Sequence, residues 1–316
     1  MEYERKAEPI GRELVKRLLP RRDPEGHKGT FGKVLCLCGS VGYTGAPVFA
    51  SRGAVRSGAG LVFLGVPESI WPVAAVKSDE AMPFPLPEAE GRLSLLAEET
   101  IRRRAAGCDA VLLGCGLGRG WQTDALVRRL MDLPQPVREL LAQTDKPVVL
   151  DADGINALAG HMDEWERRRG RVTVLTPHEG EFLRVGGDLS QGRTAAAEDF
   201  ARRSGAVVVL KGPGTVVAGP DGRCRMNTTG NCGMAKGGSG DVLSGVVLAL
   251  LGLGMDAFDA CCCAVWLHGR GSGGAGAGTV GHDTHGSSGA SATGPAGSDG
   301  IERRRERESF PEGRRR

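Results

Sequence analysis

The chain has 316 residues, of which 40% are hydrophobic and 25% charged, and its formal net charge is +3 at pH 7. That length and apolar content allow one large α/β domain or two small ones. The segment from residue 269 onward carries eight arginines against six acidic residues, so most of the basic excess lies there and gives no signature of nucleic-acid binding.

No uncharged apolar run reaches the roughly 18 residues of a membrane span, and the charged residues 1–12 do not resemble a signal peptide. We therefore expect a cytoplasmic protein without a membrane partner. The nine cysteines fit that compartment as buried thiols, with Cys36 and Cys38 in a predicted strand and residues 261–263 in a predicted helix. Their spacing does not match zinc ligands, so we predict neither a metal role nor a disulfide for them.

The N-terminal part of the chain predicts a strand, a glycine turn and a helix in direct succession. A short amphipathic helix is expected over residues 13–19, followed by a strand over 33–38, a glycine turn over 39–46 and a helix over 47–57. This order places the turn at the carboxyl edge of a sheet, where α/β proteins bind ligands. The turn matches neither the dinucleotide-binding fingerprint nor a P-loop.

The same pattern repeats along the chain, which predicts a mostly parallel sheet with helices on both faces. Residues 82–87 are interpreted as a proline-rich crossing, and a small β-hairpin is expected over 215–225 with its turn at 220–222. The further strands are predicted over residues 60–66, 110–113, 147–150, 172–175 and 206–210. The helices are predicted over residues 95–106, 121–131, 137–143, 156–161 and 194–204.

Polar residues follow several of these predicted strands. Asp151 and Asp153 follow one strand, residues 176–181 follow the next, and Lys211 begins a tight turn over 211–215. A lysine can reach phosphate oxygens as a point charge, and a glycine-rich turn lets the backbone approach a nucleotide closely. Taken alone, Lys211 is equally well interpreted as a solvated lysine at a strand end.

A glycine-rich loop over residues 227–245 runs into a predicted apolar helix over 242–253. Glycines let backbone N–H groups turn toward a ligand, and a helix start adds unpaired N–H groups and the positive end of its dipole. This layout predicts an anion hole. By itself, Asp241 at the helix start could be a capping residue or a catalytic base, and its position favours the capping role. The two roles are compatible.

The loop closely resembles the signature of the ADP/ATP-dependent NAD(P)H-hydrate dehydratases, a branch of the ribokinase-like superfamily. Its sequence is Asn-Thr-Thr-Gly-Asn-Cys-Gly-Met-Ala-Lys-Gly-Gly-Ser-Gly-Asp-Val-Leu-Ser-Gly. The resemblance covers about residues 12–268 and implies a ribokinase-like α/β fold. The other similar segments are residues 27–32, 39–46, 57–61, 114–118, 151–156, 176–181 and 211–215.

The resemblance implies repair of damaged cofactor. Members of this family return the S epimer of hydrated NADH or NADPH to the reduced cofactor, consuming ADP to AMP or ATP to ADP and releasing phosphate, with Mg²⁺ as cofactor. Hydroxide is a poor leaving group, so the hydrate's hydroxyl is first phosphorylated, and the lone pair of the ring nitrogen then helps to expel phosphate. Catalysis of phosphoryl transfer is mostly electrostatic positioning.

The resemblance also implies roles for individual residues. Asp241 is the catalytic base, and Gly238, Ser239 and Gly240 form the anion hole. The implied nucleotide-binding residues are Lys211, Gly212, Pro213, Gly214, Thr215 and Gly240. The implied binding residues for the hydrated dinucleotide are Ala46, Gly116, His178 and Asp241. His178 has the alternative interpretation of a hydrogen-bonded histidine at a strand end.

No metal ligand is assigned from the sequence. Asp151, Asp153 and Asn156 are candidates either for holding waters of Mg²⁺ or for a polar network, because Mg²⁺ keeps several waters and binds mainly through phosphates. His282 and His285 lie in a glycine-rich segment and are not predicted to bind metal.

Two features depart from the family pattern. Cys115 stands where the family usually has proline in a Gly-Pro-Gly-Leu-Gly turn, which keeps the glycines. Residues 269–300 hold twelve glycines, with Val280 as the only large apolar residue, and such a segment cannot bury enough surface to order itself. We therefore expect a catalytic domain over residues 1–268 and a low-complexity tail over 269–316, disordered or derived from a frameshift.

Two other functions stay open on the sequence. One is a small-molecule kinase of the same superfamily, acting on a hydroxymethylpyrimidine or a thiazole, which the glycine loop and Asp241 alone permit. The other is an inactive nucleotide-binding remnant. A homo-oligomer and a separate epimerase in the same pathway are further expectations, whereas the choice between ADP and ATP is not determined by these residues.

Overall fold

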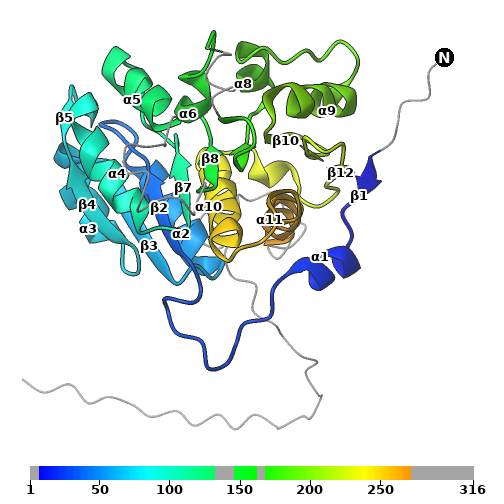
Figure 1. The fold of residues 1–316 in the computed structure, drawn as a ribbon, viewed down its shortest axis with the longest axis horizontal. Helices are drawn as coiled ribbons and strands as arrows, with labels where there is room; N and C mark the ends of the chain where they lie inside the picture. Colours follow the sequence, from blue (N-terminus) through cyan, green and yellow to red (C-terminus); the bar gives the residue numbers. More distant parts are fainter. Residues whose placement is uncertain (1–6, 132–145, 162–167, 272–316) are drawn as a thin grey trace, which may run out of the picture.

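The computed structural model describes residues 7–131, 146–161 and 168–271. Its centre is a ten-stranded sheet with the strand order β1-β12-β11-β10-β9-β8-β7-β2-β3-β4 (Figure 1). The strands are β1 (Glu8–Pro9), β2 (Lys33–Leu37), β3 (Leu61–Pro67), β4 (Met82–Leu86), β7 (Ala110–Leu113), β8 (Val148–Leu150), β9 (Thr173–Leu175), β10 (Val207–Leu210), β11 (Val216–Ala218) and β12 (Cys224–Met226).

The sheet is mostly parallel, as predicted. Only β11 runs against its neighbours, since it pairs antiparallel with both β10 and β12, and every other neighbouring pair is parallel. The antiparallel pair β11 and β12 is the predicted small hairpin. At the far edge, β1 pairs with β12, and its Glu8 lies opposite Arg225.

Helices cover both faces of the sheet, because successive side chains of each buried strand point to opposite sides. In β2, Val34 and Cys36 belong to one apolar cluster, and Leu35 and Leu37 belong to the other. The first cluster packs against α1 (Arg12–Leu18), α2 (Gly45–Arg56), α3 (Trp71–Lys77), α10 (Ser239–Gly252) and α11 (Ala257–Gly271). The second packs against α4 (Glu98–Ala106), α5 (Trp121–Met131), α6 (Asp153–Asn156), α8 (Glu179–Arg184) and α9 (Arg193–Ser204).

The interpretation of residues 82–87 as a crossing is wrong, because Met82–Leu86 forms strand β4 and pairs in parallel with β3. Proline removes a ladder donor, and a sheet tolerates that only at its edge. In β4, Pro83 and Pro85 alternate along the outermost strand of the sheet. The prolines of this segment therefore led us to miss an edge strand in the sequence.

Other differences are smaller. The sequence prediction missed α3, α8, the 3-10 turns η1 (Glu68–Ile70), η2 (Leu95–Ala97) and η3 (Cys232–Met234), and the short two-stranded sheet of β5 (Glu88–Ala89) and β6 (Arg92–Leu93). Helix α6 ends at Asn156, where the predicted helix begins. The helix predicted over 137–143 lies outside the described residues.

Helices α2 and α10 lie against each other at two glycines. A Cβ atom on Gly53 would come within 2.6 Å of the Val242 carbonyl oxygen, and one on Gly245 within 2.1 Å of the Ala50 carbonyl oxygen. Both distances are shorter than any real contact, so the backbones meet only because the side chains are absent. This contact fixes α10, and with it the glycine loop that precedes the helix.

Helix α11 continues past His268 to Gly271, three residues beyond the predicted domain boundary. The predicted tail from residue 272 onward, including His282 and His285, lies outside the described residues. All nine cysteines are free thiols. Of the helices in the described part of the chain, none is both long enough and apolar enough to cross a bilayer.

Candidate active site

The ends of three strands meet at the start of α10. In the sheet order, β10, β9, β8 and β7 are neighbours that run in parallel, so their carboxyl ends share one edge. That edge carries Lys211 after β10, Asp151 after β8 and Cys115 after β7. The predicted polar strand ends are therefore brought together.

A glycine makes this convergence tight. Gly114 has a φ of 135°, and a Cβ atom on it would come within 1.8 Å of the Asp151 carbonyl oxygen. Only glycine can occupy this backbone conformation at this distance. The turn after β7 therefore lies directly on the turn after β8.

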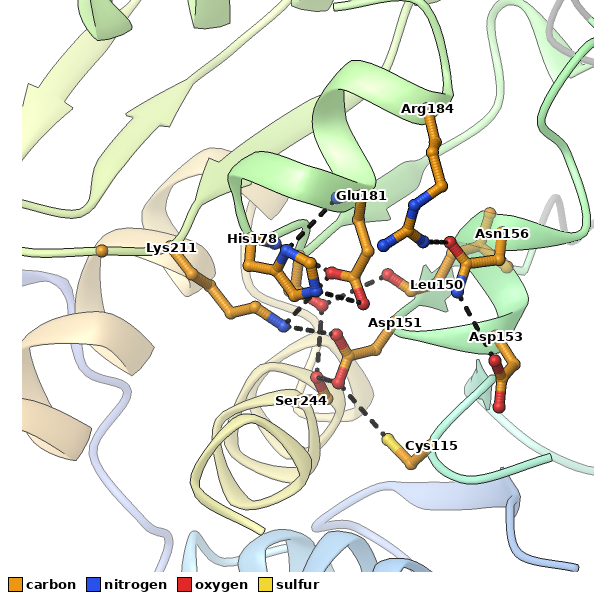
Figure 2. A network of polar contacts seen from close by, with 12 residues as sticks. Cys115, Leu150, Asp151, Asp153, Asn156, His178, Glu181, Arg184, Lys211 and Ser244 are labelled. Carbon is orange, nitrogen blue, oxygen red and sulfur yellow. Dashed lines mark hydrogen bonds and ion pairs between the residues drawn. The ribbon is translucent and has the colours of Figure 1, made fainter. Parts of the chain in front are cut away.

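Asp151 is the anchored carboxylate of the site (Figure 2). It is 1% exposed, and its Oδ1 accepts a hydrogen bond from Lys211 Nζ at 2.8 Å. Its Oδ2 accepts from Ser244 Oγ of α10 at 2.9 Å and from Cys115 Sγ at 3.5 Å. Burial would raise the pKa of Asp151, but the Lys211 ammonium and the hydrogen bonds from Lys211, Thr176 and Ser244 outweigh it and lower that pKa.

Lys211 is the matching cation. Besides Asp151, its Nζ lies 3.8 Å from Oε2 of the buried Glu181. Burial favours the neutral amine, but the two carboxylates prevail and raise the pKa of Lys211. Lys211 therefore stays charged, and four-fifths of its side chain is covered, since 21% is exposed.

Asp241 lies in the first turn of α10 but does not cap the helix. The N-cap is Gly238, with a φ of 89°, and no side chain makes a capping hydrogen bond there. The capping interpretation of Asp241 is therefore wrong. Burial first, and then the negative charge of Asp151, raise the pKa of Asp241 to about 7, against the opposing influence of Cys115 and Lys211. Near neutral pH this carboxylate can accept a proton.

We call Asp151, Asp241, Cys115 and Lys211 the carboxylate cluster. A cavity of about 1010 Å³ opens beside it. Lys211 lines it together with the turn that follows, the glycine loop, and Ser239 and Gly240 at the start of α10. Backbone N–H groups at a helix start and a lysine suit an anionic ligand such as a nucleotide phosphate. All residues implied for nucleotide binding line this one cavity, namely Lys211, Gly212, Pro213, Gly214, Thr215 and Gly240.

The residues implied for dinucleotide binding do not share one wall. His178 lines the cavity, whereas Ala46, Gly116 and Asp241 are not among the described residues that line it. Ala46 and Gly116 do lie together, because a Cβ atom on Gly116 would come within 2.8 Å of Ala46 Cβ. Asp241 therefore belongs to the carboxylate cluster rather than to the cavity wall.

His178 has a structural contact of its own. It is the N-cap of α8, where its Nδ1 accepts from Glu181 N at 3.2 Å and its own N–H donates to Glu181 Oε2 at 2.8 Å. Its Nε2 lies 3.3 Å from Glu181 Oε1, and 53% of the side chain is exposed (Figure 2). His178 is therefore a hydrogen-bonded histidine that also faces the cavity.

Sequence reasoning missed His268, which comes from α11 and lines the cavity. It is 8% exposed, and its Nε2 lies 3.5 Å from Ser239 Oγ. Burial and the nearby Lys211 lower the pKa of His268 to about 4, so the ring is neutral at physiological pH. The sequence contained no signal beyond the position of His268 at the end of the last apolar run. Glu181, Thr176 and Ser244 were also missed as partners within the network.

Asp153 and Asn156 take part in a polar network (Figure 2). Asp153 Oδ2 accepts from Gly118 N at 2.9 Å, and Asn156 Nδ2 donates to Asp153 Oδ1 at 3.4 Å. Asn156 Oδ1 in turn accepts from Arg184. These bonds connect the turn after β7 to α6 and α8.

Potential ligand atoms of Cys115, Asp151 and Asp241 lie within 4.8 Å of one another. They do not form a cage for Mg²⁺, because both oxygens of Asp151 already accept hydrogen bonds and Cys115 is a protonated thiol. An ion that arrives with nucleotide phosphates and its own waters needs no such cage.

Comparison with known proteins supplies the family. The sequence profile of the NAD(P)H-hydrate dehydratase family matches residues 34–280. The ADP-dependent (S)-NAD(P)H-hydrate dehydratase of Bacillus subtilis is 39% identical over 264 residues, which cover 81% of this chain and 86% of that protein. The bifunctional NAD(P)H-hydrate repair enzyme Nnr of Moorella thermoacetica is 41% identical over 256 residues, covering 79% of this chain but 46% of that protein. The chain thus spans about half the length of such bifunctional relatives.

Solved structures agree in fold. The ADP/ATP-dependent NAD(P)H-hydrate dehydratase from Bacillus subtilis, co-crystallised with ATP and Mg²⁺, superposes with a TM-score of 0.68 at 31% identity and covers 89% of this chain and 95% of that one. A ribokinase-like superfamily protein from Enterococcus faecalis gives a TM-score of 0.70 at 22% identity, covering 83% and 86%. The predicted ribokinase-like fold is confirmed.

Proposed function

From the premise that the chain belongs to the NAD(P)H-hydrate dehydratase family, we propose that it is a repair enzyme that dehydrates the S epimer of hydrated NADH or NADPH. ADP or ATP serves as co-substrate and becomes AMP or ADP with release of phosphate. The names of the relatives and the similarity to the structure obtained with ATP and Mg²⁺ support this assignment.

The placement of Asp241 carries the proposal. It is a carboxyl group with a pKa of about 7 in the first turn of a helix, and the two preceding residues, Ser239 and Gly240, line the cavity. A carboxylate that titrates near the working pH is suited to general-base catalysis. The helix start beside it is suited to the negative charge of a transferring phosphoryl group.

In the first step, the hydroxyl oxygen of the hydrate attacks the terminal phosphorus of the nucleotide. Its proton passes to the Asp241 carboxylate, and the bond between the terminal phosphorus and the bridging oxygen breaks to release the shortened nucleotide. The ammonium of Lys211 and the N–H groups at residues 238–240 stabilise the phosphoryl oxygens. When bound with the nucleotide, Mg²⁺ neutralises phosphate charge, and we place it on phosphates and water rather than on these side chains.

In the second step, the carbon–oxygen bond of the phosphorylated hydrate breaks and phosphate leaves with the bonding electrons. The ring nitrogen lone pair stabilises the cationic ring that results. Transfer of the proton on C5 to water then restores the C5=C6 double bond. The protein's contribution to this step is to hold the phosphate at the start of α10.

The roles of Ala46, Gly116 and His178 in holding the hydrated dinucleotide stay predictions, as do the roles of Gly212 to Thr215 toward the nucleotide. His178 lines the same cavity as Gly212 to Thr215, whereas Ala46 and Gly116 are not among the described residues that line it. A homo-oligomer, and a separate epimerase that supplies the S epimer, also stay predictions.

The test incubates the purified protein with hydrated NADH, Mg²⁺ and either ADP or ATP while the absorbance band of reduced nicotinamide is followed. We expect recovery of absorbance that requires nucleotide, and we expect the Asp241→Asn variant to abolish it. Accumulation of a phosphorylated alcohol without recovery would instead indicate a kinase. Nucleotide binding without turnover of any substrate would indicate an inactive remnant.

A further inference from the structure

Cys115 occupies an unusual place for a thiol, because its sulfur lies within 4.8 Å of an oxygen of each of the two carboxylates of the site. We propose that Cys115 is a positioning residue whose S–H group donates a hydrogen bond into the pair Asp151 and Asp241, and so fixes how readily Asp241 takes a proton. The inference rests on the proposed function in that Asp241 is taken as the base.

The first argument is geometric. Cys115 is fully buried, and its Sγ lies 3.5 Å from Asp151 Oδ2, within the range of a hydrogen bond to sulfur. A sulfur, one oxygen of Asp151 and one oxygen of Asp241 all lie within 4.8 Å of one another. Lys211 and Ser244 already hold Asp151 in place, so Asp151 cannot move toward or away from the thiol. The thiol therefore bonds to a restrained carboxylate and lies within 4.8 Å of an oxygen of the proposed base.

The second argument is the protonation state of the sulfur. The neighbouring Cys38 thiol, and then burial, raise the pKa of Cys115 far above its ordinary value, and both carboxylates act in the same direction. Cys115 is therefore an S–H group and not a thiolate. A neutral donor beside two carboxylates stabilises their charged forms without adding a charge of its own.

The third argument is what else faces Asp241. Asp151 after β8 and Asp153 of α6 raise its pKa, and Lys211 after β10 lowers it. His268 of α11 also lies near Lys211 but is neutral at physiological pH. Replacing Asp151, Asp153 or Lys211 would remove a full charge, whereas replacing Cys115 removes none, so the contribution of Cys115 can be isolated experimentally.

The fourth argument concerns the turn after β7. The family resemblance places proline at position 115, and proline can follow Gly114 there but carries no hydrogen-bond donor in its side chain. The backbone carbonyl of Cys115 accepts from Gly39 N at 2.8 Å, a bond that any residue at this position retains. The backbone bond of this turn therefore does not depend on sulfur.

The experiment compares Cys115→Ala, which removes the donor, with Cys115→Ser, which retains one. Cys36→Ala is the matched control, because Cys36 is also a fully buried thiol but comes from the middle of β2. Two readouts are recorded for each protein: the acid limb of kcat against pH, and Tm against pH for each variant with and without Asp241→Asn. The second readout reports the titration of Asp241 even if the enzyme proves inactive toward hydrated NADH, so failure of the proposed function remains distinguishable.

We expect Cys115→Ala to move both the acid limb and the Asp241-dependent change in Tm upward by about half a pH unit, since one weak hydrogen bond to the charged form is lost. Cys115→Ser should return both to the wild-type position, and Cys36→Ala should lower Tm without moving either. Unchanged pH positions in Cys115→Ala, or equal shifts in the alanine and serine variants, would falsify the proposal and leave Cys115 as a packing residue.

Discussion

The cavity and the carboxylate cluster lie side by side but differ in the residues that form them. The cavity wall includes glycines such as Gly212, Gly214 and Gly240, and Lys211 is one of its two lysines. The cluster consists of side chains, among which Asp151 and Asp241 are pushed in opposite directions, one pKa lowered and the other raised to about 7. Two carboxylates with separated pKa values mark the point where a proton is handled, whereas a glycine-rich wall marks where an anion is bound.

The difference suggests a division of labour. If the proposed roles hold, binding depends mainly on backbone N–H groups, which most side-chain substitutions retain, together with Lys211, and chemistry depends on a few side chains of the carboxylate cluster. Lys211 belongs to both regions, because it lines the cavity and holds Asp151. Substitutions in the cluster should therefore have large effects, and substitutions in the loops around the cavity should have small ones.

The largest effect is expected for Asp241→Asn on catalysis. Loss of a general base lowers kcat by about 10²- to 10⁴-fold, and the amide cannot take the hydroxyl proton. The nucleotide dissociation constant, measured by calorimetry, should change by less than about threefold, because the cavity wall is intact. A comparable loss of nucleotide affinity would contradict the separation of the two regions.

The same substitution should stabilise the protein at high pH. Burial and the negative charge of Asp151 raise the pKa of Asp241 in the folded state to about 7, from an ordinary value of 3.8. The charged carboxylate therefore destabilises the fold increasingly as the pH rises from about 4 to 7, by up to about 4 kcal/mol above pH 7. We expect the unfolding free energy of Asp241→Asn to exceed that of wild type at pH 8 and to exceed it by clearly less at pH 5. Urea denaturation at the two pH values provides the measurement.

Lys211→Met should affect both regions at once. It leaves the buried Asp151 without its cation, and breaking a buried pair in this way costs about 3 to 5 kcal/mol. Nucleotide binding should weaken by about tenfold or more, because a direct phosphate partner is lost. The double variant Lys211→Met/Asp151→Asn serves as control, since it should regain stability without regaining nucleotide affinity. Recovery of both would mean that Lys211 serves only Asp151.

The smallest effects are expected on stability, for alanine substitutions at two glycines, one in α10 and one in the loop before it. Gly245→Ala places a Cβ atom within 2.1 Å of the Ala50 carbonyl oxygen and should cost about 1 to 3 kcal/mol. Gly237→Ala meets nothing within 4 Å and should stay within about 0.5 kcal/mol of wild type. Thermal unfolding of both variants tests this contrast. Equal losses of Tm would mean that the helix contact does not fix the start of α10.

Much of the fold followed from simple patterns. Apolar runs such as Ala110–Leu113, each followed by glycine or acidic residues, predicted parallel strands whose carboxyl ends carry the site. The prediction of an element was wrong where its local composition and its tertiary context disagree. Strand β4 is rich in proline and forms only because it is an edge, and α8 is short and depends on a cap formed by His178 and Glu181.

The site was predictable where one sequence segment contains all of its parts. The loop over 227–245 and the turn over 211–215 both reach the cavity, although the roles assigned to their residues stay predictions. The cluster was less predictable because its members come from four separate segments. Ser244 carries no sequence signal as a partner of Asp151, and His268 becomes part of the site only through the packing of α11. The prediction that Asp241 caps the helix was wrong because Gly238 is the N-cap.

The pairing of β1 with β12 has a consequence for how the chain is made. Glu8 lies opposite Arg225, and Ile10, which follows β1, is buried and donates its N–H to the Met226 carbonyl oxygen. During synthesis, these early residues cannot pair with β12 until the hairpin of β11 and β12 has left the ribosome. Contacts between residues so distant in sequence also form slowly. The edge of the sheet at β12 then stands open in the nascent protein, and its closure by β1 is expected among the last steps of folding.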